Sequence, residues 1–128
     1  MRSLLVVLLL LTLSVAQMNA VTTLTVKKYR SDMASDLSRQ ILTVYIRGMG
    51  EGMIWINTKL ERQKRPLFCL AEKVVLNDDN YIDIIDAQIK KLAAATTQAE
   101  LDDFQIGTIL MYGLQATFPC NSEVTKPH

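Results

Sequence analysis

Apolar residues recur at spacings of three and four through the middle of the chain, as they do along one side of an α-helix. The first helix is predicted to begin after Ser31 or Ser35, because serine is a favourable N-cap and acidic residues follow each of them. Its apolar stripe consists of Leu37, Ile41, Val44, Gly48, Gly52 and Trp55. We expect this stripe to face the core or a second copy of the chain.

Three glycines, Gly48, Gly50 and Gly52, lie inside this helix. Each lowers helix stability by roughly 1 kcal/mol relative to alanine. Two interpretations remain open: Gly48 and Gly52 let another helix approach closely, or the glycines divide the segment into two helices with a bend. A phosphate-binding loop is disfavoured, because neither a preceding strand nor the rest of a glycine-rich fingerprint is present.

The C-terminal end of the first helix is basic. The run Lys59–Arg65 places cations where the helix dipole is negative, and Pro66 then stops the helix. A second amphipathic helix follows the cap-forming residues Asn77–Asp79 and has Lys90 and Lys91 in its final turns. Its apolar positions are Tyr81, Ile84, Ile85, Ile89 and Leu92.

A capping box at Thr97–Glu100, with a hydroxyl first and a carboxylate three residues later, predicts the start of the last helix. This helix is expected to run through Phe104 to Leu114 and to end before Pro119. From Ile106 onward it is apolar nearly all round, which is typical of a helix at the centre of a bundle or of a dimer. The pattern as a whole predicts one all-α domain, a small helical bundle.

The N-terminus has the pattern of a secretory signal peptide. Arg2 precedes an apolar run, Leu4–Leu11, which is much shorter than the roughly 20 residues of a membrane-spanning helix. Small residues at Ser14 and Ala16 match the positions that signal peptidase reads. Cleavage is therefore expected after Ala16, with Ala20 as the alternative.

We assign residues 1–16 to the signal peptide and residues 17–128 to a soluble, exported helical domain. No later apolar run is long enough to span a membrane. Weak alternation over Val21–Lys28 predicts a mobile leader, with a short edge strand as the alternative. The polar tail Asn121–His128 is expected to be disordered.

Charge gives no indication of a nucleic-acid or lipid partner. Removal of Arg2 from the 14 basic residues leaves 13 basic against 13 acidic side chains, and a neutral surface does not favour polyanions. Gln17–Leu76 has ten Lys or Arg against five Asp or Glu, and the remainder has three against eight. One interpretation is that the two oppositely charged halves neutralise each other when the chain folds. The other is that they form a polar surface for a charged protein partner.

Two cysteines, Cys69 and Cys120, remain in the exported domain. In an oxidising compartment they are expected to form one disulfide, with free thiols as the alternative. The bridge would close a loop of about 51 residues, which stabilises the fold by roughly 4 kcal/mol in the chain-entropy description.

The residues needed for catalysis or for a metal centre do not occur together. The sole histidine, His128, stands at the C-terminal end, so a thiol nucleophile, a Ser-His-Asp triad or a zinc site lacks a component. The carboxylate pairs Asp78-Asp79 and Asp102-Asp103 lie at predicted helix starts, where the dipole explains them. We expect no enzymatic activity, no metal and no cofactor.

Four features follow one another: a glycine-rich first helix around Val44–Gly50, the pair Phe68-Cys69, a capped helix over Asn77–Leu92 and the ending Thr117–Cys120. In this order they resemble the Rap/Tai-type family of type VI secretion immunity proteins. The resemblance covers most of Asp36–Cys120, and its most specific parts are the two motifs that contain cysteine.

The resemblance implies a periplasmic, all-helical protein, often a homodimer, that binds and blocks a peptidoglycan-cleaving amidase effector. The implied mechanism is steric: one element of the protein fills the toxin's active-site groove. A small periplasmic chaperone of the acid-stress type is the alternative, and the same fold with an unrelated partner is a third interpretation. The contact is expected in a connection between helices, at Glu61, Arg62, Lys64 and Arg65 or at Thr96, Thr97 and Gln98.

Overall fold

The computed structural model describes residues 23–120, and this part of the chain is helical. Its helices are α2 (Val26–Met33), α3 (Asp36–Arg62), α4 (Asp78–Ala93), α5 (Gln98–Asp103) and α6 (Ile106–Thr117). The predicted all-α fold is confirmed, since these residues form no strand beyond one isolated bridge. The predicted signal peptide, both cleavage positions and the C-terminal tail lie outside the described residues.

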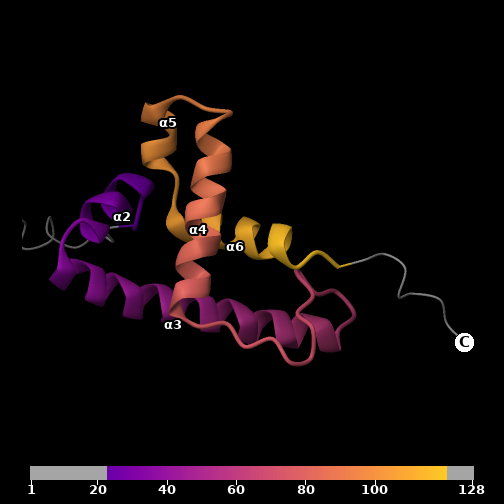
Figure 1. Cartoon of the computed structure of the whole chain (residues 1–128). Helices are drawn as coiled ribbons and strands as arrows, with labels where there is room; N and C mark the ends of the chain where they lie inside the picture. Colours follow the sequence, from indigo (N-terminus) through magenta and orange to yellow (C-terminus); the bar gives the residue numbers. More distant parts are fainter. Residues whose placement is uncertain (1–22, 121–128) are drawn as a thin grey trace, which may run out of the picture.

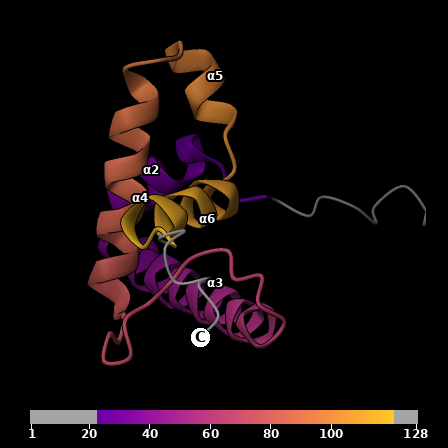
Figure 2. The same cartoon turned by 90° about the vertical axis from the view of Figure 1, so that its right-hand side faces the viewer.

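The longest helix, α3, forms one edge of the molecule (Figure 1). At about 1.5 Å per residue, its 27 residues extend for about 40 Å. α4 stands across α3 and packs against both α3 and α6, while α2 packs against α3 and α5. In both views the other four helices lie mainly on one side of α3 (Figure 2).

The core lies where α4, α6 and the inner side of α3 meet. The apolar positions predicted for α4 and α6 contribute most of it, and Gly113 of α6 lies directly against Ile84 of α4, where a Cβ would overlap that side chain. The buried apolar residues are Val26, Tyr29, Leu42, Ile46, Phe68, Tyr81, Ile84, Ile85, Ile89, Leu101, Ile106, Ile109, Leu110 and Leu114.

The side of α3 that enters the core is not the predicted stripe. Its buried residues are Leu42, Ile46, Gly50 and Asn57. The predicted stripe points away from the core, and its end residue Trp55 is 80% exposed. Because α3 is apolar on two sides, the spacing did not identify which side faces the core. A core role for the stripe is therefore wrong, and its pairing with a second copy stays a prediction.

The close helix contact of α3 is made by Gly50 rather than by Gly48 and Gly52. A Cβ at Gly50 would overlap the ring of Tyr81, so α4 crosses α3 at this glycine. Apart from the adjoining residues and the backbone of α3 itself, no heavy atom of the described chain lies within 4 Å of the Cβ positions of Gly48 and Gly52. The predicted close contact at these two glycines is thus not made within the fold. The alternative of a bend is also wrong, because α3 is one continuous helix.

The helix α2 was not predicted. Thr25 caps it, and Val26 and Tyr29 are buried against the rest of the molecule. The Tyr29 hydroxyl donates a hydrogen bond of 2.7 Å to Asp86, and burial together with this carboxylate raises the pKa of Tyr29. The expectation of a mobile leader or edge strand over Val21–Lys28 is therefore wrong from residue 26 onward, because tertiary packing stabilises a short helix there.

The predicted last helix is divided in two. Phe104 and Gln105 are extended, with φ, ψ of −63°, 138° and −80°, 131°. The backbone around them pairs with the segment that precedes α2: Val26 N–H donates to the Phe104 carbonyl and Ile106 N–H to the Leu24 carbonyl, both at 2.9 Å. This long-range pairing, which a local capping pattern does not reveal, separates α5 from α6.

The helix starts agree with the predicted caps. Ser35 is the N-cap of α3, although its side chain makes no capping hydrogen bond, and Ser31 lies inside α2. Asn77 forms a reciprocal capping box at the start of α4. Thr97 and Glu100 form the second one, at the start of α5.

Candidate functional site

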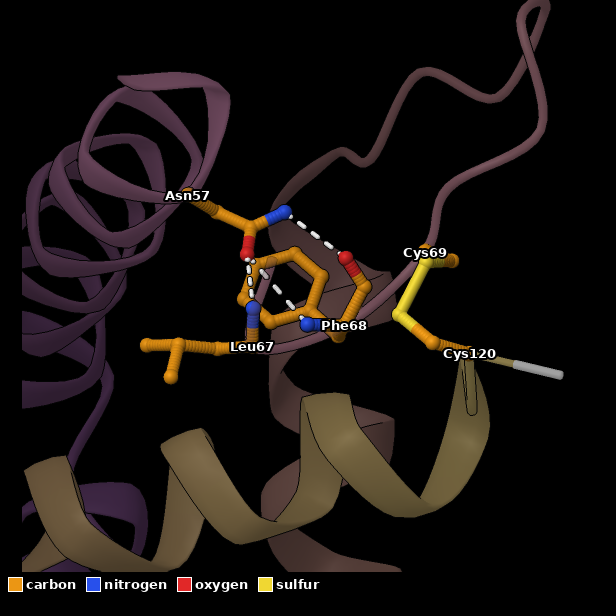
Figure 3. The surroundings of a disulfide bond; sticks show 5 residues. All are labelled: Asn57, Leu67, Phe68, Cys69 and Cys120. Carbon is orange, nitrogen blue, oxygen red and sulfur yellow. Dashed lines mark hydrogen bonds between the residues drawn. A yellow bond between two sulfur atoms is a disulfide. The ribbon is translucent and has the colours of Figure 1, made fainter. Parts of the chain in front are cut away.

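The end of the molecule where α3 finishes is closed by a disulfide (Figure 3). Cys69 and Cys120 are bonded, with their Cα atoms 4.9 Å apart, and they join residues 51 positions apart in sequence. The predicted pairing is confirmed, so the alternative of free thiols is wrong. The bond ties the α3–α4 connection to the end of α6 and is typical of a protein in an oxidising compartment.

A buried amide fixes the same connection to α3. The Asn57 side chain accepts hydrogen bonds from the backbone N–H of Leu67 and Phe68 at 2.7 and 3.2 Å, and it donates one to the Phe68 carbonyl at 2.8 Å (Figure 3). Cys69 N–H donates to the Phe118 carbonyl at 2.8 Å. The Phe68 ring is fully buried. The hydrogen bonds therefore hold the chain here to α3 on one side and to the end of α6 on the other.

Residues 61–65, which we call the basic turn, comprise the last two residues of α3 and the first three of the connection to this anchored segment. Arg65 N–H donates to the Leu60 carbonyl at 2.9 Å and Lys64 N–H to the Glu61 carbonyl at 2.8 Å, the two bonds of a Schellman motif. Lys64 has φ of 58°, a conformation that normally favours glycine. The turn gathers four of the predicted contact residues, all exposed: Glu61, Arg62, Lys64 and Arg65.

The other predicted contact residues lie in the connection between α4 and α5, at the far end of the molecule (Figure 1). The Glu100 carboxylate accepts from the hydroxyls of Thr96 and Thr97, both at 2.7 Å, and from Thr97 N–H at 3.1 Å. These bonds lower the pKa of Glu100 to about 2. Gln98 donates to Asp102 at 2.6 Å. The polar groups of this connection are thus occupied locally, and the structure does not bring it together with the basic turn.

The outward side of α3 carries a surface for which the sequence pattern allowed a core role. Ile41 and Tyr45 line a groove of about 330 Å³ between α2 and α3, together with Leu24 and Lys28. Exposed apolar side chains that lie together on one side of a helix, beside a groove, are typical of a protein-interaction site. We call this surface the outer face of α3 and define it by Leu37, Ile41, Val44, Tyr45, Gly48, Gly52, Trp55 and Ile56.

An ion pair braces α3 against the start of α4. Arg47 donates to both carboxylate oxygens of Asp78, which lowers the pKa of Asp78 and raises that of Arg47. Among residues 23–120, no group of His, Cys, Asp and Glu side chains is arranged to hold a metal ion. Two further ion pairs of the described residues join Lys28 to Asp32 and Arg30 to Asp102.

No protein family, curated protein or solved structure compared with this chain matches it. Within the described part, no helix combines the length and the apolar composition needed to cross a membrane.

Proposed function

We propose that the exported chain is a periplasmic immunity protein that binds and blocks a peptidoglycan-cleaving amidase toxin delivered by type VI secretion. The proposal begins from the resemblance carried by the glycine-rich helix and the two cysteine motifs. The disulfide supports export, because such bonds persist in oxidising compartments. The role is binding rather than catalysis.

The observation that carries the proposal is the fixed geometry of the basic turn. The Schellman motif holds its start, while Asn57 and the Cys69–Cys120 bond hold the chain that follows it. Lys64 keeps the left-handed backbone of this motif, which costs an L-residue roughly 1–2 kcal/mol. A turn fixed in advance loses little conformational freedom on binding, so more of its contact energy appears as affinity.

The inhibition we propose is steric. The basic turn stands at the C-terminal end of α3 (Figure 1). Its Arg62, Lys64 and Arg65 are exposed. It would occupy the active-site groove of an amidase whose rim is acidic, since opposite charges favour both the encounter and its orientation. The connection at Thr96–Gln98 lies at the other end of the molecule, and its polar side chains are already hydrogen-bonded to Glu100 and Asp102. We therefore assign the groove contact to the basic turn.

Protection from lysis tests the proposal. The exported protein is produced together with the periplasmic amidase encoded beside it, and lysis is followed by culture density. We expect protection and a stoichiometric complex of the two purified proteins. Unchanged lysis together with no binding at micromolar concentrations would contradict the proposal.

Charge reversal tests the assigned contact. Replacing Arg62, Lys64 and Arg65 together by glutamate should weaken amidase binding at least about tenfold, which corresponds to about 1.4 kcal/mol. The matched control reverses Lys90 and Lys91, two exposed lysines in the last turn of α4, and should bind as the native protein does. Equal loss of binding in the control, or none in the triple variant, would remove the basic turn from the interface.

One observation favours the alternative function, a periplasmic chaperone of the acid-stress type. The outer face of α3 exposes apolar side chains, which is the kind of surface that holds unfolded proteins. If the protein suppresses aggregation of unrelated proteins at low pH and does not bind the amidase, the chaperone function replaces the immunity function.

A further inference from the structure

The last turns of α3 carry a shallow hollow of about 580 Å³. Its lining residues are related by spacings of three and four, so they share one side of the helix, and they extend for about 12 Å along its axis. That length is enough for two linked sugar rings. The lining consists of Ile54, Trp55, Thr58, Lys59 and Arg62. We propose that this hollow binds a saccharide that carries a carboxylate.

Trp55 supplies the flat apolar surface on which a sugar ring can stack. Its side chain is 80% exposed, so the indole is open to a ligand. One face of a pyranose ring can present C–H groups alone, and these pack against the electron-rich face of an aromatic ring. The neighbouring wall is Ile54, which packs against the core. The apolar part of the hollow is therefore fixed before a ligand arrives.

Thr58 makes the hollow select for a ligand that donates a hydrogen bond. Its hydroxyl donates to the Ile54 carbonyl at 2.9 Å, so the proton of this hydroxyl is already used. Toward a ligand the Thr58 oxygen can only accept. An ionised carboxylate has no proton to give, whereas a sugar hydroxyl has one. The ligand that satisfies Thr58 therefore carries hydroxyl or amide groups in addition to any charge.

Lys59 and Arg62 select for an anionic group on the same ligand. Both side chains are exposed, and within residues 23–120 neither forms an ion pair. Lys28, Arg30 and Arg47, by contrast, are each paired with a carboxylate. Lysine and arginine carry donors only, and charge-assisted hydrogen bonds to a carboxylate are the strongest that they make.

The hollow as a whole thus matches a hydroxylated ring with a carboxylate beside it. Muramic acid, a repeating sugar of peptidoglycan, has this constitution, because its ring carries hydroxyl groups and a lactyl carboxylate. An acidic protein segment would supply the carboxylate without the ring. The binding chemistry stands by itself, and only the source of the ligand, the cell wall, rests on the proposed periplasmic function. Bound to the wall, the protein would be held where an amidase acts.

Titration with two sugars tests the chemistry. N-acetylmuramic acid and N-acetylglucosamine share one ring and differ by the lactyl carboxylate, and Trp55, the single tryptophan of the chain, reports on the hollow. We expect a saturable change of Trp55 fluorescence with millimolar N-acetylmuramic acid and at least about tenfold weaker binding of N-acetylglucosamine.

Two variants separate the polar groups of the hollow. Replacing Lys59 and Arg62 together by glutamine should bring the ratio of the two affinities close to one, because the donors that read the carboxylate lose their charge. Thr58→Val should weaken both sugars by the same factor, since its hydroxyl faces the ring rather than the carboxylate.

Sedimentation with purified cell-wall sacculi tests the source of the ligand. The disulfide-bonded exported chain should sediment with the sacculi, and Trp55→Ser should weaken this binding at least about tenfold. The control, Leu37→Ser, removes an exposed apolar side chain at the other end of the outer face and should bind as the native protein does. Trp55→Ser should keep its amidase binding, because Trp55 is not part of the basic turn.

Four results would overturn the proposal. They are equal affinity of the native chain for the two sugars, native sedimentation of Trp55→Ser with sacculi, and a response to polyglutamate as strong as that to N-acetylmuramic acid at the same carboxylate concentration. The fourth is a native fluorescence spectrum of a buried indole, which would show that a second copy or another segment covers Trp55. If the expected results are obtained and the amidase is not bound, the immunity function fails and the saccharide site stands.

Discussion

The two sides of α3 are both apolar, yet they are used differently. The inner side holds Gly50 against the Tyr81 ring and Asn57 against the segment that leads to the disulfide, so it is fixed by contacts with α4 and with the α3–α4 connection. The outer side has glycines of the same type, Gly48 and Gly52, with nothing against them. The glycines of α3 therefore differ in what lies opposite them. Gly50 makes room for the Tyr81 ring, whereas Gly48 and Gly52 face no other part of the described chain.

This difference explains why the sequence pattern did not identify the side of α3 that is buried in the core. A helix with one apolar stripe buries it, whereas a helix at the edge of a fold that has two buries only the one that faces the other helices. In α3 the stripe with the more regular spacing is the outer one, and the buried side includes the polar residue Asn57. Hydrophobic period predicted the helix and did not predict its orientation.

The largest effect is expected at the anchored end of the inner side. Cys120→Ser opens a loop of 51 residues and should lower the free energy of unfolding by about 4 kcal/mol. Urea unfolding of the variant against the native protein, both in the absence of reductant, measures this loss. The bond would be incidental to stability if the variant unfolded at the same urea concentration.

Gly50→Leu tests the inner side of α3 directly. The new side chain must displace the Tyr81 ring, and overpacking of this kind costs about 3 kcal/mol, more than the gain in helix propensity returns. The comparison variant is Gly48→Leu, measured at a dilution that keeps the chain monomeric. Equal destabilisation of the two variants would mean that the sides of α3 do not differ as described.

Gly48→Ala is expected to have a smaller effect of the opposite sign. In the diluted, monomeric protein it should raise the free energy of unfolding by about 1 kcal/mol, because alanine is the better helix former and meets nothing at this position. Thermal unfolding at two protein concentrations separates this gain from any effect on pairing. A loss of stability at high dilution would show that another part of the chain covers the outer face.

The smallest effect is expected at Glu100, which belongs to neither side of α3 and so serves as a reference. Its pKa is lowered to about 2 in the folded protein, from an ordinary value of 4.5. The stability it contributes is therefore present above about pH 5 and is lost as the pH falls toward 2. Glu100→Gln should remove this part of the pH dependence while leaving saccharide binding and amidase binding unchanged. An identical pH profile in the variant would show that the hydrogen bonds to Thr96 and Thr97 contribute nothing.

Local signals in the sequence predicted the parts of the fold that depend on local structure. The cap at Asn77, the capping box at Thr97, the end of α3 before Pro66 and the burial of α6 all follow from neighbouring residues. The pairing of Cys69 with Cys120 was predicted because the domain that we expect to be exported contains two cysteines.

The features that were missed depend on contacts distant in sequence. α2 is stabilised by burial of Val26 and Tyr29, and the break between α5 and α6 by backbone pairing of Phe104 with Val26. The basic turn was selected from sequence as a connection between helices, but the left-handed backbone of Lys64 is visible only in the structure. Its contact with an amidase stays a prediction.

The fluorescence of the chain's single tryptophan, Trp55, tests most directly whether the outer side of α3 is open in the folded protein. From nanomolar to micromolar protein concentration the emission should be that of a water-exposed indole and should be quenched freely by acrylamide. With saturating N-acetylmuramic acid it should shift to shorter wavelength and resist quenching. A native spectrum that is already that of a buried indole without any ligand would contradict the account.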